Sequence, residues 1–135
     1  MSNEVYLHRS MAPDLLLGRV SGSGKVYATR TGPDKYIGRV EANNGKIYAA
    51  RTGPDDYLGR VDLENGKVYR SLVGPDEYLG RVDKDGSLYY HQPMARDMYI
   101  GKVADMTAIS NGGAAFLLLV LPEVEAGLSE DESND

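Results

Sequence analysis

Two sets of charged residues recur along this chain every 20 or 21 residues and are its first candidates for chemistry. The basic set consists of Arg19, Arg39, Arg60, Arg81 and Lys102. The acidic set consists of Asp14, Asp34, Asp55, Asp76 and Asp97. If the repeats form a ring, each set lies at one level of it, and the basic set predicts an anion-binding site on the ring axis. The other interpretation is a structural ladder in which each cation pairs with an aspartate.

The tyrosines follow the same period and suggest a second kind of ligand. They recur as one series at Tyr6, Tyr27, Tyr48, Tyr69 and Tyr89, and as another at Tyr36, Tyr57, Tyr78 and Tyr99. Rings in such a series can stack on sugars. They can equally pack at the edge of a core with the hydroxyl at the rim. A small-ligand ring that binds an anion or a carbohydrate is therefore our alternative prediction.

The two histidines occupy equivalent positions near the two ends of the repeat array. His8 follows Val-Tyr-Leu and His91 follows Leu-Tyr-Tyr, so a closed ring would bring both to one seam. A metal site there would need further ligands, and no cysteine or suitably spaced acidic cluster stands beside them. We therefore predict packing at the seam, with no metal and no cofactor.

Catalytic patterns are missing from the sequence. The glycines belong to hairpins, not to a strand-loop-helix that could cradle a phosphate. No serine lies in a nucleophile-elbow pattern. The carboxylates follow the repeat or lie in the last residues, so none forms a distinctive pair. We predict no catalytic residues and no enzymatic activity.

The repeat that positions these residues reads TGPDKYIGRV, TGPDDYLGRV and VGPDEYLGRV in its clearest copies. Gly-Pro-Asp is turn chemistry, and the five residues after it predict a strand. Strict alternation would place tyrosine, glycine and valine on one face and Ile/Leu and arginine on the other. The glycine in mid-strand predicts a bend or a close approach of neighbouring backbone. A polar turn and a short second strand such as KIY complete a hairpin that needs neighbours for stability.

The two ends of the array are complementary halves of one hairpin. Residues 5–14 align without gaps on residues 88–97, so the chain begins with a second strand and the repeats end with a first strand, 99–103. Pairing of these halves would close the array and remove its free edges. We predict an all-β fold, a closed pseudo-symmetric ring of about five antiparallel hairpins.

This pattern resembles the β-flower families of uncharacterised bacterial proteins, which are closed assemblies of repeated hairpins. The resemblance covers residues 5–103 and rests on the Gly-Arg-Val strands and the Gly-Lys/Ser-hydrophobe-Tyr strands. Five copies imply the five-fold form, whereas four complete covalent hairpins leave the four-fold form open. Leu16 departs from the repeated tyrosine and Arg96 from the turn proline. The resemblance implies a fold and no activity.

Residues 104–121 break the symmetry. They end in eight consecutive apolar residues, 114–121, which are too few to span a bilayer and predict either a helix or a buried strand. Such a segment must plug one face of the ring, meet a partner copy or touch a membrane. Its interaction candidates are Phe116, Leu117, Leu118 and Leu119. Residues 122–135 carry six acids and no base and predict a flexible acidic tail.

Composition bounds the remaining function classes. The chain has 135 residues, no cysteine and a net charge of −5. Since the six acids of the tail account for that charge, the body is nearly neutral and nucleic acid is not an expected partner. The N-terminal sequence lacks the features of a secretory signal, and we expect a cytoplasmic protein. The prediction is a non-catalytic structural or protein-interaction module that self-associates through its apolar segment, with membrane contact the less favoured possibility.

Overall fold

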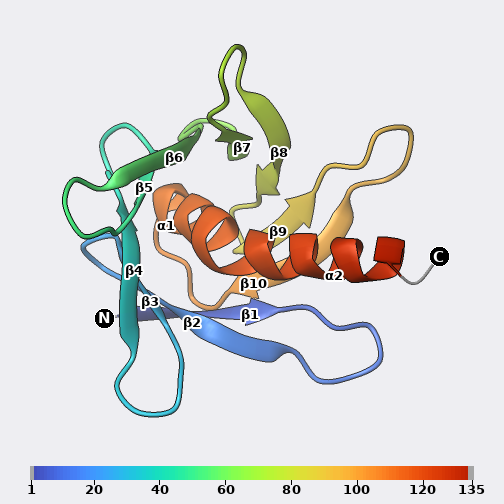
Figure 1. Ribbon diagram of the computed structural model, residues 1–135, viewed down its shortest axis with the longest axis horizontal. Coiled ribbons are helices and arrows are strands. Elements are labelled where there is room, and N and C mark those ends of the chain that lie inside the picture. The colour runs from blue at the N-terminus through green and yellow to red at the C-terminus, as the bar shows by residue number, and fades with distance from the viewer. Residues whose placement is uncertain (1, 134–135) are drawn as a thin grey trace.

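The computed structural model describes residues 2–133, with side chains from Ser2 to Gly127, as a ring of strands around a helix (Figure 1). The strands are β1 (Ser2–Leu7), β2 (Leu15–Ser21), β3 (Lys25–Ala28), β4 (Lys35–Val40), β5 (Lys46–Ala49), β6 (Asp56–Val61), β7 (Lys67–Arg70), β8 (Glu77–Val82), β9 (Ser87–Tyr90) and β10 (Met98–Val103). The helical elements are α1 (Ile109–Ala115), the π-helical η1 (Phe116–Val120) and α2 (Leu121–Ser133).

The ring closes through its two chain ends, as the sequence predicted. All ten strands form one closed antiparallel barrel in which β1 pairs with both β2 and β10. At the seam, Val5 lies opposite Val103 and Tyr6 opposite Lys102. A covalent hairpin has the same register, with Tyr27 opposite Arg19. The two half-units therefore form a fifth hairpin, so the ring has five hairpins and not four.

A β-bulge in every repeat overturns the predicted alternation of faces. Between β3 and β4, Val26 lies opposite Gly38 but Tyr27 lies opposite Tyr36, so Ile37 has no opposite residue. Leu17, Leu58, Leu79 and Ile100 are skipped in the same way. The extra residue turns inward and packs on the core, which leaves Tyr36 and Arg39 together on the outer face.

The repeated mid-strand glycine is explained by close approach from two sides. A Cβ atom on Gly38 would lie 2.4 Å from the carbonyl oxygen of Tyr48 in the neighbouring strand and 2.8 Å from Cδ1 of Leu118 in the helix. Contacts this short are not tolerated by real Cβ atoms. The prediction that this glycine marks close backbone approach is confirmed.

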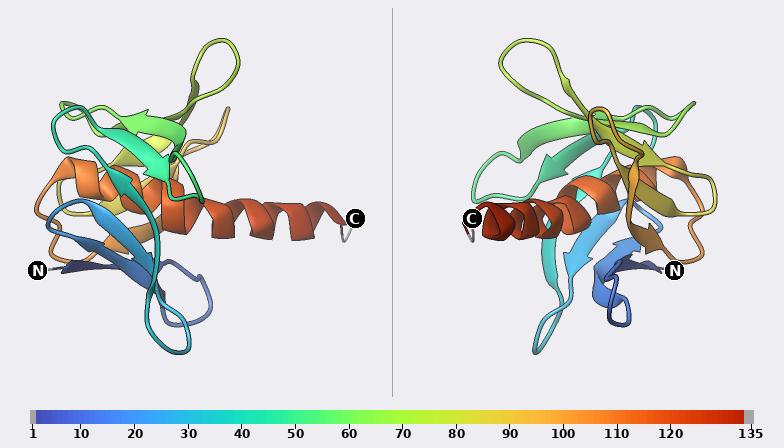
Figure 2. Two further views of the ribbon diagram at one scale, coloured as in Figure 1. Left: turned by 60° about the vertical axis from the view of Figure 1, so that its left-hand side comes forward. Right: turned by 90° about the vertical axis from the view of Figure 1, so that its right-hand side faces the viewer.

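The C-terminal helix runs through the ring instead of covering one face (Figures 1 and 2). Helix α1 contacts the first strand of every hairpin: β2, β4, β6, β8 and β10. It fits because its residues are small: a Cβ on Gly112 would lie 2.3 Å from Val82, and one on Gly113 would lie 2.4 Å from Val61. One turn later, Phe116 is fully buried, and its ring lies 3.0 Å from where a Cβ atom on Gly80 would be.

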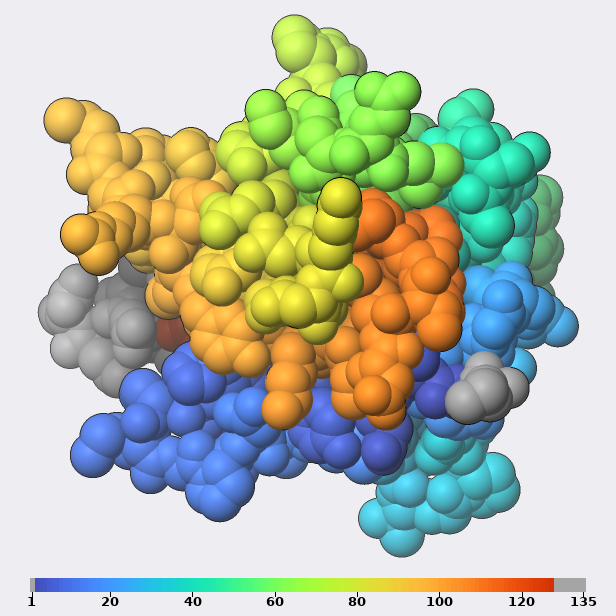
Figure 3. All heavy atoms as spheres, turned by 180° about the vertical axis from the view of Figure 1, so that it is seen from behind, coloured from blue at the N-terminus to red at the C-terminus, as the bar shows by residue number. Residues whose placement is uncertain are grey.

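A collar of apolar side chains lines the inside of the ring and forms its core with the helix. Each hairpin contributes two of them: Val5 and Val103, Val20 and Val26, Val40 and Ile47, Val61 and Val68, and Val82 and Leu88. All are at most 4% exposed. Seen from behind, the start of the helix and the connection before it fill the mouth of the ring (Figure 3).

The structure resolves the alternatives for residues 104–135. The apolar segment is helical, not a strand, and the helix continues through the acidic residues to Ser133, where the sequence predicted a flexible tail; residues 134–135 lie outside the described part. The stretch Ile109–Gly127 is 19 residues long with a mean hydropathy of 1.3, enough by length and composition to cross a membrane. Its best 18-residue window is 61% buried, so its role as the core accounts for its composition.

Five loops connect the hairpins and radiate outward, and we call them petals (Figure 1). They are petal 1 (8–14), petal 2 (29–34), petal 3 (50–55), petal 4 (71–76) and petal 5 (91–97). Helix α2 leaves the ring on the petal side, where Arg70 at the base of petal 4 donates two hydrogen bonds to Glu125 at 3.2 and 2.9 Å. The helix then projects past the petals (Figure 2).

Candidate interaction surface

The outer face of the ring carries a repeating ladder of arginine, tyrosine and aspartate. In one repeat, Arg39 donates from Nε to Asp55 at 2.9 Å, and its guanidinium carbon lies 4.2 Å from the ring centroid of Tyr48. The tilted ring of Tyr57 lies 5.5 Å from that of Tyr48. Arg19 and Arg60 make the same contacts with the next aspartate and with Tyr27 and Tyr69. Arg81 stacks on Tyr89 in the same way, but it reaches Asp97 through Nη1 while its Nε donates to Asp83. The ladder thus links each hairpin to the next petal.

The five basic residues lie on this outer ladder and do not line the axis, which the helix fills. Arg39 and Arg60 are 36% and 40% exposed, and each is already paired with an aspartate. Lys102 is the degenerate member, with its Nζ 5.5 Å from the ring centroid of Tyr6. Between the two interpretations of the charged sets, the geometry is that of the structural ladder.

The ladder also shifts the titration of its tyrosines. Burial raises the pKa of Tyr57, and the nearby Asp76 carboxylate raises it further. Burial and a neighbouring aspartate raise the pKa of Tyr36, Tyr78 and Tyr99 in the same way. These hydroxyls therefore keep their protons to a higher pH than a free tyrosine does.

The two histidines extend the ladder in two neighbouring repeats, each with partners of its own. The Nδ1 atom of His91 lies 3.3 Å from Asp97, and its ring lies 5.0 Å from that of Tyr78. His8 lies 3.4 Å from Asp14, with its ring 4.9 Å from Tyr99. Among the described side chains, Ser2 to Gly127, no three histidine, cysteine, aspartate or glutamate residues are grouped as metal ligands.

The apolar residues predicted to meet a partner lie inside the ring. Phe116 is 0% exposed, Leu117 5% and Leu119 6%, and Leu118 packs beside them as a partly buried residue. An interface through these side chains would require the helix to leave the core. These side chains are therefore not part of the exposed surface of the folded protein.

The three most exposed of the large apolar residues lie at the tips of three petals. Met11, Val73 and Met94 occupy the same position of petals 1, 4 and 5, three residues before the ladder aspartate, and are 95%, 108% and 105% exposed. Petals 2 and 3 carry Thr31 and Thr52 there. Since β8 pairs with β9 and β10 with β1, the three apolar petals are neighbours. We call petals 4, 5 and 1 the divergent arc and petals 2 and 3 the regular arc.

Met94 is held in a backbone conformation that disfavours its own side chain. The amide of Ala95 donates to the carbonyl of Gln92 at 3.3 Å, with Pro93 and Met94 between them. The φ angle of Met94 is 61°, as in a type II turn, whose third position favours glycine or asparagine. The turns of petals 2 to 4 place glycines at their positive φ angles, among them Gly32 and Gly53. Neither packing nor backbone geometry explains the methionine.

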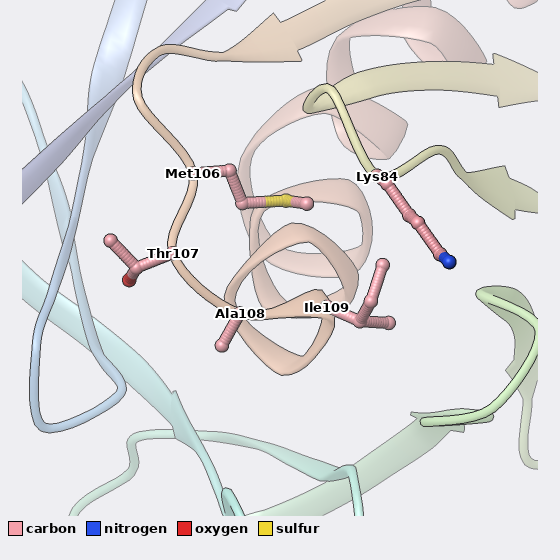
Figure 4. Close-up of a pocket in the computed structure, with 5 residues that line it drawn as sticks. All are labelled: Lys84, Met106, Thr107, Ala108 and Ile109. Atoms are coloured by element: carbon pink, nitrogen blue, oxygen red, sulfur yellow. The ribbon is translucent and has the colours of Figure 1, made fainter.

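Two hollows on the described surface have distinct linings. One, of about 240 Å³, lies at the mouth of the ring between Lys84, Met106 and Ile109, with Thr107 and Ala108 (Figure 4). It is mostly apolar, and the sticks show no set of converging polar groups. The other, of about 190 Å³, lies at the base of petals 4 and 5 and is lined by Glu77, Tyr78, Leu79, Tyr90, His91 and Pro93. The second belongs to the divergent arc.

The petal tips were missed by the sequence analysis, although a signal was present. In a repeat, each departure from the consensus is visible, and the apolar residues replace threonine in neighbouring copies. Petals 1 and 5 are also one residue longer than the other three.

In comparisons with known proteins, no family model, no curated protein and no solved structure matches this chain.

Proposed function

We propose that this chain is a non-catalytic protein-interaction module that binds its partner through the divergent arc, and that it is a five-fold member of the β-flower families. The closed ring of hairpins supports the family assignment. The ladder supports a structural use of the chemistry-bearing side chains, because its arginines, aspartates and tyrosines are engaged with one another and not aimed at a common site.

The observation that carries the proposal is the exposure of Met11, Val73 and Met94 on three adjacent petals. Threonine serves the same position in the regular arc, so folding does not require an apolar residue there. Met11, Val73 and Met94 are fully exposed apolar side chains on three neighbouring petals, and exposed apolar groups are used in contact surfaces. A rigid ring would present these tips at fixed spacing, which lowers the entropic cost of binding.

This surface replaces the apolar segment as the proposed point of self-association. The ring fold depends on Phe116 and its neighbours staying inside, whereas the petal tips are available in the folded protein. The arginines of the ladder offer no comparable support for an anion site, since each is already paired.

A photo-crosslinker placed at single petal tips tests the proposal. A benzophenone amino acid at position 94 should yield covalent protein adducts in cells that express the chain. The same group at position 31, the equivalent tip of the regular arc, should yield few. Equal yields from both positions, or none from position 94, would contradict an interaction role for the divergent arc.

A further inference from the structure

Petal 5 carries a protruding group and a receiving hollow side by side. Met94 projects fully into solvent, and Pro93, the residue before it, lines the 190 Å³ pocket. The buried Leu79 and the rings of Tyr78 and Tyr90 line the pocket, together with Glu77 and His91. It is smaller than the roughly 300–1,000 Å³ of pockets for drug-sized ligands, so its size suits one side chain.

We infer that the divergent arc binds a second copy of this chain, with Met94 of each copy inserted in the pocket of the other. The inference rests on the proposed function and names its partner. In a two-fold dimer, one surface meets itself, so a tip and a pocket on the same patch satisfy each other twice. Methionine suits the pocket because its flexible thioether packs well against aromatic rings.

The strained turn supports this occupant. A methionine at positive φ with its side chain in solvent is unfavourable in the isolated protein. Burial in a partner's aromatic pocket would offset both the exposure and the backbone cost. Nothing within a single copy does so for Met94.

Charge complementarity favours a second copy over an unrelated surface. Helix α2 projects from the petal side, and the sequence from residue 122 onward carries six acids and no base (Figure 2). Petals 1 and 5 carry the exposed Arg9 and Arg96, and petals 2 and 3 carry the equally exposed Arg30 and Arg51. A two-fold pair on the petal face would bring the acidic helix of one copy toward such arginines of the other. The ion pair of Arg70 with Glu125 is the same contact made within one chain.

Tip and pocket can be altered separately with residues suited to their positions. Met94→Asn introduces a residue that tolerates positive φ and removes the apolar side chain. Tyr90→Ala installs the residue found at the equivalent positions Ala28 and Ala49 of the regular repeats. Thr52→Asn, at the tip of petal 3, is the matched control.

Sedimentation velocity over a concentration series provides the test. We expect a reversible dimer whose dissociation constant rises about tenfold or more in Met94→Asn and in Tyr90→Ala. The control should dimerise as the wild type does. A tip-in-pocket dimer further predicts rescue on mixing the two variants, because the heterodimer keeps one intact contact while each variant homodimer keeps none.

Three outcomes would overturn the inference: a monomer at all concentrations, a dimer indifferent to both variants, or no rescue on mixing. Native mass spectrometry of the same samples would reveal a small molecule in the pocket as extra mass on a monomer, which would also overturn it. If position 94 crosslinks to other proteins but the pure chain stays monomeric, the inference fails and the proposed function stands. If nothing crosslinks, both fail.

Discussion

The regular and divergent arcs are built from the same repeat and face the same core, yet they end in different petals. Petals 2 and 3 share the sequence TGPD and present Thr31 and Thr52. Petals 4, 5 and 1 read VGPD, MARD and MAPD and present apolar residues at that position. Inside the ring the same comparison shows little change, since every hairpin contributes its two collar residues and its mid-strand glycine, and the hairpins of β8 and β10 add the buried Leu79 and Ile100.

This difference teaches which parts of a repeat are free to change. The residue types of the collar and of the mid-strand glycine are constrained because they pack around the helix inside the ring. Those of the ladder are constrained by contacts from one hairpin to the next. The petal tips touch neither. Their departures nevertheless lie in adjacent petals and share one chemical character, which is why we assign them to binding.

The largest expected loss of stability comes from a substitution in the interior, which both arcs share. Phe116→Ala should lower the free energy of unfolding by about 3–5 kcal/mol, because it leaves a cavity where the fully buried phenyl group of Phe116 was. Urea denaturation of a dilute sample measures the change, with Thr52→Ala as the exposed control. A loss below about 1 kcal/mol would mean that the helix is not the core.

A smaller effect is expected at the ion pair that fastens the helix to one arc only. Arg70 stands where the regular repeats have Ala28 and Ala49, and it holds Glu125 through two hydrogen bonds. Because the two side chains are 31% and 42% exposed, Glu125→Gln should cost only about 1 kcal/mol, and less at high salt. A double-mutant cycle with Arg70→Ala measures the coupling, and a coupling of zero would contradict the contact.

Alkaline pH should weaken both arcs through the ladder. Burial, and then the adjacent aspartate, raises the pKa of Tyr57 in the folded chain, while in the unfolded chain it titrates near its ordinary value of about 10. The unfolded state then loses its proton first, so stability is kept below about pH 10 and lost as pH rises through the folded pKa. Asp76→Asn should lower the pKa of Tyr57, as followed by tyrosinate absorbance. An unchanged titration would contradict the ladder.

The smallest expected effect on stability is at the tips themselves. Met94→Gly relieves a positive φ angle, so it should leave the free energy of unfolding of the monomer unchanged or raise it by up to about 1 kcal/mol. Val73→Thr, which installs the regular tip, should change it by less than about 0.5 kcal/mol. Thermal denaturation at protein concentrations too low for dimerisation measures both changes. A clear loss at either tip would show a structural role instead.

Much of the fold could be predicted because aligning the copies of a repeat shows which positions are shared by all of them. The alignment of residues 5–14 with 88–97 led to the seam of Val5 and Val103, which the register confirms. The alternation failed at Ile37 because a bulge adds one residue without altering composition, so a period of two cannot detect it. The helix inside the ring could have been suspected from Gly112 and Gly113, whose small size only matters once a collar surrounds them.

The surface was predictable only in part. The cations were correctly grouped by their spacing, but the bulge decides that they face outward, and no pattern in the sequence reports it. The ladder interpretation anticipated their pairing with aspartates such as Asp55. The tips of petals 1, 4 and 5 were visible as departures from threonine, yet their exposure depends on loops that leave the ring.

Methyl resonances of the methionines test the central claim most directly. The chain has five methionines, among them the tip Met94 and the interior-facing Met106, and Met94→Asn identifies the signal of the tip. If copies pair tip to pocket, raising the concentration should shift the Met94 methyl upfield, under the rings of Tyr78 and Tyr90, while that of Met106 stays in place. A Met94 signal that keeps its dilute position at every concentration would contradict the account.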